Sequence, residues 1–187
     1  MKTQKLQTKG SLHRRTFFRQ AAILGTAFSL NPLGHPLLAA PIADPKDPLD
    51  PAVVKDFVGK AHNDLDRVTE IIGEHPLVLN VAWDWGNADF ETALGAAGHV
   101  GRRDIAEFLL EKGARADIFV LTMLGETEIV KAILERFPGL LNSIGPHGFT
   151  LLHHAKRGGD AAQNLLDYLT EKGLTETFID VFGKNKK

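Results

Sequence analysis

Three histidines near the C-terminal end of the chain could bind a metal ion. His147, His153 and His154 fall within eight residues of one another. Imidazole nitrogen is a good ligand for zinc and copper, so this cluster is a candidate metal site. The spacing does not match H-E-x-x-H or another established metal motif. Metal binding is therefore an alternative hypothesis. The leading hypothesis, protein binding, involves neither a metal nor another cofactor.

Residues suited to enzymatic catalysis are scarce in the chain. Beyond residue 43 the only serine is Ser143, which lacks a surrounding G-x-S-x-G, and the only tyrosine is Tyr168. No glycine-rich phosphate loop follows a predicted strand. The sequence contains no cysteine, which excludes disulfides, thiolate-bound zinc and thiol catalysis. We predict that the protein is not an enzyme.

The charge of the chain is distributed unevenly. Residues 1–43 contain six Lys and Arg and no acidic residue, so all 23 Asp and Glu lie from Asp44 onward. The segment from Asp44 carries a net charge of −7 with histidine neutral. Such a segment repels phosphate backbones and anionic lipid headgroups, so we expect neither nucleic acid nor a membrane surface as partner.

The first 43 residues have the order of a targeting segment. A basic stretch ends at Arg14 and Arg15, an apolar run covers residues 21–33, and small residues follow. A membrane anchor is the alternative, but a spanning helix needs roughly 20 consecutive apolar residues. This run is shorter and is interrupted by a proline, so we predict no stable membrane anchor.

The arginine pair, with Phe17 two places later, resembles a twin-arginine signal peptide. The resemblance covers residues 1–43 and implies transport by the Tat machinery. It also implies a periplasmic or otherwise exported protein, cleaved near Ala40 to Ala43. Residues 44–51 alternate proline with charge and are predicted to form a linker.

Beyond the linker, four segments share one pattern: a helix of small residues, a break, and a second helix with paired aliphatic residues. In each second helix the apolar residues fall three and four apart, which predicts one buried stripe and one charged face. The predicted second helices begin near Asp64, Arg103, Glu126 and Asp160.

This pattern resembles the ankyrin repeat. The most specific matches to the family's T-P-L-H-x-A are Thr150-Leu151-Leu152-His153-His154-Ala155 and Thr92-Ala93-Leu94-Gly95-Ala96-Ala97. The resemblance implies an all-α fold, an ankyrin-repeat solenoid of about four helix-turn-helix repeats with short or reduced β-turn fingers, over residues 52–178. Residues 179–187 are expected to form a frayed tail. At the position of His153 the family's imidazole usually bonds to neighbouring turn backbone, which gives this histidine a structural role.

The resemblance also implies a function, which is to bind another protein of unknown identity through a concave surface. Two tryptophans in the long connection before Phe90 are either a plug over the core or anchors for that partner. The predicted partner-binding residues are Trp83, Trp85, Phe90, Ala96, His99, Phe149, His154 and Arg157.

Overall fold

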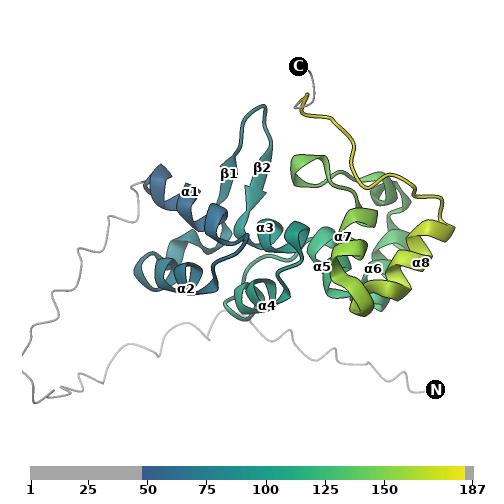
Figure 1. Ribbon diagram of the computed structural model, residues 1–187, viewed down its shortest axis with the longest axis horizontal. Coiled ribbons are helices and arrows are strands. Elements are labelled where there is room, and N and C mark those ends of the chain that lie inside the picture. Colours follow the sequence, from purple (N-terminus) through teal and green to yellow (C-terminus); the bar gives the residue numbers. More distant parts are fainter. Residues whose placement is uncertain (1–47, 184–187) are drawn as a thin grey trace, which may run out of the picture. The chain divides into compact units, whose positions relative to one another are not determined.

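The computed structural model describes residues 48–183, so the predicted signal residues Arg14, Arg15 and Phe17 lie outside the described residues. The described chain is predominantly helical, as predicted, and its α-helices follow one another in pairs (Figure 1). In chain order they are α1 (Pro51–Lys60), α2 (Leu65–Glu74), α3 (Ala93–Val100), α4 (Arg103–Glu111), α5 (Ile118–Leu124), α6 (Thr127–Arg136), α7 (Leu151–Gly158) and α8 (Gln163–Glu171).

Short elements connect these helices. The 3₁₀ helices are η1 (Pro76–Asn80), η2 (Pro138–Asn142), η3 (Pro146–Gly148) and η4 (Gly159–Ala162). The strands β1 (Ala82–Asp84) and β2 (Phe90–Thr92) form an antiparallel hairpin. The sequence places Trp83 and Trp85 in a loop. This holds for Trp85, which lies after β1, but Trp83 lies in β1 and pairs with Glu91 across the hairpin.

Side-chain caps set the first residue of several helices. Thr92 and Thr150 begin α3 and α7, and each hydroxyl accepts a hydrogen bond from the backbone three residues on. Gly101 and Gly125 end α3 and α5 in the left-handed conformation, with φ of 80° and 79°. Helices α3 and α7 thus match in length, since each begins directly after its threonine and ends directly before a glycine, Gly101 or Gly159.

The connection between α4 and α5 is short. Residues 113–117 lead directly into α5, whose first turn is capped when Asp117 Oδ1 accepts a hydrogen bond from the amide of Val120 at 2.9 Å. This connection is therefore a short loop and not an extended finger.

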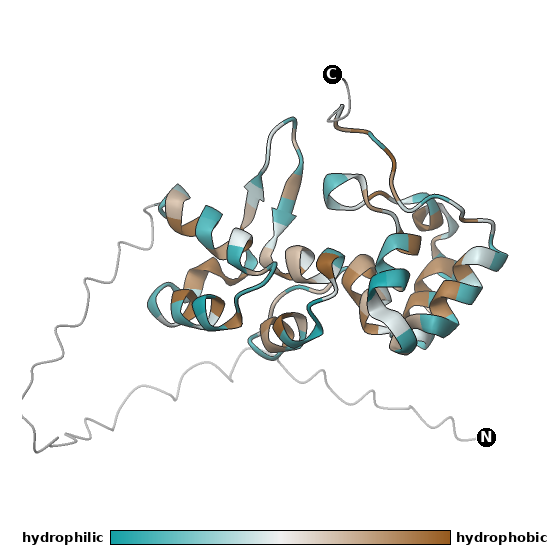
Figure 2. Ribbon diagram, in the orientation of Figure 1, coloured by the Kyte–Doolittle hydropathy of each residue, from teal (hydrophilic) through white to brown (hydrophobic). Residues whose placement is uncertain are grey.

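The first helices of successive pairs contact one another: α1 with α3, α3 with α5, and α5 with α7. Small residues allow this approach, since a Cβ on Gly98 would lie 2.8 Å from Val120 Cγ2. The paired helices carry hydrophobic residues on one side and hydrophilic residues on the other (Figure 2). One group of buried side chains includes Phe57, Val68, Ile105 and Leu109, and another includes Val130, Leu134, Leu151, Leu165 and Leu169.

The predicted boundaries differ from the observed ones at both ends. Helix α1 begins at Pro51, one residue before the predicted repeat domain, and Asp50 caps it. The described part of the predicted frayed tail is held by hydrogen bonds to its backbone: the amide of Ile179 donates to the Gly148 carbonyl at 2.9 Å, and the Phe182 carbonyl accepts from Asn87 Nδ2.

Within residues 48–183 no helix is both long and apolar enough to cross a membrane.

Candidate metal centre

Four side chains with metal-binding atoms converge on one point of the described chain. His62 lies two residues after α1, Glu91 in β2, His99 in the last turn of α3, and His147 in the turn η3. One ligand atom from each side chain lies within 4.8 Å of the other three. We refer to these four residues as the histidine–glutamate cluster.

The nearest atoms of the cluster lie at hydrogen-bond or ion-pair distance, and all four ligand atoms lie within 4.8 Å of one another. His99 Nε2 is 2.9 Å from Glu91 Oε1 and 3.0 Å from His62 Nε2, and His147 Nε2 is 3.2 Å from Glu91 Oε1. Ligands at about 2.0–2.1 Å from a tetrahedral zinc ion lie about 3.3 Å apart. The four donors are therefore spaced so that one ion could contact all of them after small shifts.

Two of the imidazoles are fixed from outside the cluster. His62 Nδ1 lies 3.0 Å from the carbonyl oxygen of Gly59, and since a carbonyl only accepts, Nδ1 is the donor. His147 Nδ1 donates in the same way to Asp89 Oδ2 at 2.7 Å. In the neutral imidazoles each Nε2 then carries a lone pair that faces the cluster. This arrangement is typical of histidines that bind metals, because the outer bond fixes the tautomer and the ring orientation.

Glu91 is the buried anion at the centre of the cluster. Its Oε2 accepts a hydrogen bond of 2.7 Å from Trp85 Nε1. Its Oε1 is close to His99 and His147, but among the described residues no well-formed hydrogen bond reaches it. A buried carboxylate needs a nearby positive charge, which a protonated imidazole or a cation supplies.

The charges of the cluster shift its proton equilibria in opposite directions. Burial alone would raise the pKa of Glu91, but the contacts with His147 and His99 outweigh it and lower the pKa to about 2. Contact with Glu91 raises the pKa of His147, burial opposes this, and contact with Asp89 adds to the rise. Glu91 therefore stays ionised at neutral pH.

Successive side chains of a strand point to opposite faces, and in β2 this directs Glu91 toward the helices. Phe90 is 59% exposed, whereas Glu91 is 1% exposed, as expected for successive residues of a strand with one face on the helices. Asp89 closes the hairpin loop, where its carbonyl accepts from the amide of Trp85 at 3.0 Å. The same short stretch thus supplies a ligand, Glu91, and the carboxylate that orients His147.

Aromatic rings surround the cluster. Phe149 lies between two imidazoles, with its ring centroid 5.2 Å from that of His99 and 3.9 Å from that of His153. Trp85 lies 6.4 Å from the rings of both His62 and His147. These rings limit access of water, which strengthens electrostatic interactions inside the cluster.

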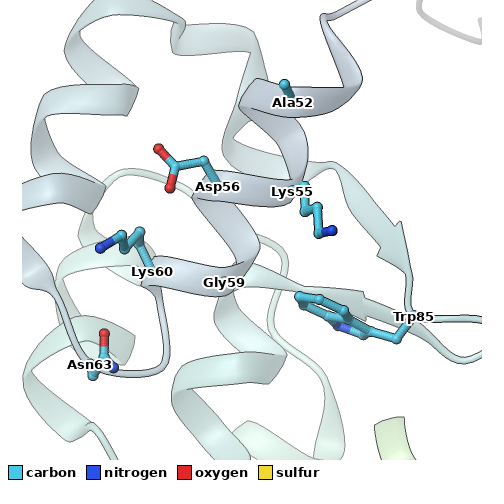
Figure 3. A pocket seen from close by; sticks show the side chains of 7 residues that line it. All are labelled: Ala52, Lys55, Asp56, Gly59, Lys60, Asn63 and Trp85. Carbon is cyan, nitrogen blue, oxygen red and sulfur yellow. The ribbon is translucent and has the colours of Figure 1, made fainter.

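A groove of about 510 Å³ is lined by residues of α1, by Asn63 and by Trp85 (Figure 3). Two of its charged side chains are in ion pairs, Lys60 with Asp64 and Asp56 with Arg67, and the third, Lys55, lies over the ring of Trp83. In Figure 3 the Lys60 and Asp56 side chains do not converge with Trp85 on a common point. The cluster, and not this groove, is therefore the candidate site.

The three histidines predicted as an alternative metal site do not converge, which corrects that prediction. Only His147 belongs to the cluster. His153 Nε2 donates to the His99 carbonyl at 2.8 Å, and His154 Nδ1 donates to the Thr150 carbonyl at 2.8 Å. Adjacent residues of a helix point about 100° apart, so neighbours in sequence cannot share one ligand position. Burial lowers the pKa of His154 to about 4.

Several predicted partner-binding residues are not on the surface, and this too is a correction. Ala96, His99 and His154 are buried because the first helices pack against one another. Phe90 and Arg157 are exposed, whereas Trp83, Trp85 and Phe149 are half-buried. Both tryptophans pack against the core, as expected for a plug.

Three residues of this site, His62, Asp89 and Glu91, are not among those predicted from the sequence. His62 lies 37 residues before His99 and 85 before His147, so no spacing rule joins them. Asp89 and Glu91 gave one local signal, which is two acidic residues at alternate positions directly before the Thr-x-Leu segment. Comparison of the chain with protein-family models, curated proteins and solved structures finds no significant match.

Proposed function

We propose that the protein binds one divalent transition-metal ion through His62, Glu91, His99 and His147. The observation that carries the proposal is the position of Glu91 Oε1, a buried oxygen with two imidazole Nε2 atoms within 3.2 Å and no well-formed hydrogen bond among the described residues. An ion among these donors would satisfy this oxygen and the imidazole lone pairs together.

The donor set defines the class of ion. Three imidazole nitrogens and one carboxylate oxygen suit zinc, nickel, cobalt and copper(II), whereas calcium and magnesium prefer oxygen ligands alone. The chain has no cysteine, so it offers no thiolate for softer ions. The competing interpretation is an ion-free polar network, in which a protonated His147 bridges Asp89 and Glu91.

A titration of the full chain without a polyhistidine tag distinguishes these interpretations. Cobalt(II) is the first probe, because its visible absorption reports the ligand geometry. Trp85, which bonds to Glu91, should lose fluorescence as the ion enters. One ion per chain is expected, with a higher unfolding temperature in zinc, since a ligand of the native state stabilises it.

Variants locate the ion. Glu91→Gln preserves the shape of the side chain and an acceptor for Trp85, but it should weaken binding by more than about 100-fold, beyond the effect of a typical outer-shell change. His75→Ala is the matched control, since His75 is a half-buried histidine outside the cluster. Equal cobalt(II) affinity of Glu91→Gln and His75→Ala would favour the ion-free network.

A second proposal concerns the helix pairs, which we propose are ankyrin-type repeats of an exported protein that binds another protein. It is supported by the threonine caps of α3 and α7 and the matching glycine ends of α3 and α5. The exposed Phe90 in the hairpin is a candidate contact. The predicted twin-arginine leader supplies the export route.

The test of the second proposal is a pull-down from the exported fraction, with the N-terminus of the recovered protein sequenced. A start near Ala40 to Ala43 with one stoichiometric partner would support export and partner binding. Retention of Met1 in the cytoplasm, with no partner, would contradict both. Phe90→Ala should reduce recovery of the partner, and the exposed Ile129→Ala serves as control.

A further inference from the structure

The C-terminal segment, residues 176–182, packs against the turn η3, which carries the fourth donor of the cluster. The amide of Ile179 donates to the Gly148 carbonyl at 2.9 Å. The hydroxyl of Thr150 donates to the Glu176 carbonyl at 2.7 Å. The segment thus runs antiparallel to residues 148–150, and Phe178 forms an isolated β-bridge with Phe149.

The fit between the segment and the turn leaves no spare room. Gly148 has φ of +92°, and a Cβ at this position would lie 2.3 Å from the Ile179 carbonyl oxygen and 3.1 Å from the ring of Phe178. A shift of the turn would therefore break its contacts with the segment. The position of one constrains the position of the other.

His147 itself is in a conformation that requires outside support. Its φ is 61°, in the left-handed region that is strained for a residue with a Cβ. Asp89 holds it by two bonds of 2.7 Å, one to its backbone amide and one to its Nδ1. An ion bound at Nε2 would add a third attachment and fix the turn further.

The C-terminal segment also touches the hairpin. Asn87 Nδ2 donates to the Phe182 carbonyl at 3.1 Å, and Asn87 lies in the loop that presents Asp89. The segment is therefore bonded to both fingers that supply the cluster: the hairpin with Glu91, and the turn with His147.

From these contacts we infer that ion binding at the cluster and docking of residues 176–182 are coupled. The inference rests on the proposed metal binding. The ion fixes the His147 turn, and the fixed turn presents Gly148 and Thr150 to the segment. Because coupling between two binding events is reciprocal, the docked segment raises the affinity for the ion, and the ion raises the fraction of docked segment. Residues 176–182 are therefore docked more often when an ion is bound at the cluster than when none is bound.

The test compares two variants at one position in the full chain. Ile179→Pro removes the amide that bonds to Gly148, whereas Ile179→Ala keeps this amide and serves as the matched control. With zinc as probe, the proline variant should bind about 10-fold more weakly than the alanine variant, within the usual range of coupling. Deletion of residues 176–187, with folding checked by circular dichroism, should weaken binding at least as much.

Hydrogen exchange supplies the reciprocal measurement. Addition of zinc to the unaltered chain should slow exchange of the Ile179 and Thr150 amides, and Glu91→Gln should abolish this slowing. Zinc binding with equal affinity in the proline and alanine variants, and unchanged exchange at Ile179, would overturn the inference and leave the metal site intact. No zinc binding by the unaltered chain would instead overturn the proposed metal site itself.

Discussion

The two halves of the described chain, residues 51–113 and 118–173, repeat the same order of elements. Each contains two helices, a 3₁₀ helix that starts with proline, a finger (residues 82–92 or 144–150), and two further helices. In the second half the 3₁₀ helix η4 lies between those last two helices. The residues before η1 and η2 have nearly equal backbone angles, with φ of −132° at His75 and −131° at Phe137. The last helix of each half ends before a left-handed glycine, Gly113 with φ of 92° and Gly173 with φ of 94°.

The halves differ in their fingers. The first finger closes with Ala82 opposite Thr92, and the second closes with Ile144 opposite Thr150, so the second is four residues shorter. The longer finger reaches far enough to form a hairpin with a buried Glu91. Glu91 precedes Thr92 in the longer finger, whereas Phe149 precedes Thr150 in the shorter one.

This difference shows how a polar site can arise between two halves with similar elements. If both fingers carried Phe before the threonine, the space between them would be apolar. Instead one finger supplies carboxylates and the other supplies His147, and the two kinds of side chain meet between the halves. The contrast also yields measurable predictions, which begin with the effect of greatest expected size.

Phe57→Ala should cause the largest loss of stability, about 3–5 kcal/mol, because it empties a fully buried aromatic site in the first half. Denaturation by urea should remain one transition if the halves unfold together. Trp83 and Trp85 report the first half by fluorescence, and circular dichroism reports all helices. Separate midpoints for the two signals would show that the halves unfold independently.

His154→Ala gives the second half the residue found at the matched position of the first, Ala96. Burial lowers the pKa of His154 from 6.5 to about 4, so the unfolded chain takes up this proton at a higher pH than the folded chain. Stability is therefore lost as pH falls from 6.5 towards 4, by about 3 kcal/mol in total.

The measurement is urea denaturation at several pH values between 7 and 4. His154→Ala should lower stability at pH 7, because a buried bond and volume are lost, but it should show a shallower decline towards pH 4. Parallel declines for the variant and the unaltered chain would contradict the assignment of this titration to His154.

Asp89→Asn tests the contribution of the longer finger to the geometry of the shorter one. Asp89 orients His147, so the change should weaken cobalt binding by about 10–100-fold, or about 1.4–2.7 kcal/mol. Calorimetry gives the affinity, and the cobalt spectrum shows whether the geometry changes. Unaltered affinity and spectrum in a folded variant would show that His147 needs no orienting carboxylate.

Gly113→Ala and Gly173→Ala should have the smallest effects, about 1 kcal/mol each, because both glycines have positive φ and open space around them. Thermal unfolding of the two variants should give equal shifts. Gly125→Ala should cost more, since its Cβ would lie 2.1 Å from the Ala161 carbonyl oxygen. A difference between Gly113 and Gly173 would weaken the equivalence of the halves.

The sequence by itself determined the helices and their ends. Apolar spacing predicted second helices near Asp64, Arg103 and Glu126, and α2, α4 and α6 begin there. The fourth, α8, begins at Gln163, after the 3₁₀ helix η4 that covers the predicted start at Asp160. Each of these signals is local, since caps and amphipathic stripes depend on residues three or four apart. The sequence signals that predict a helix therefore lie within one or two turns of that helix.

Only the tertiary structure decided which side chains meet. The cluster joins His62, Glu91, His99 and His147 from four separate elements, and only packing of the first helices brings these elements together. The sequence grouped His147 with His153 and His154 because they are neighbours in the chain. Proximity in the chain does not determine side-chain direction, and a site built from distant residues leaves no spacing for a sequence rule to detect.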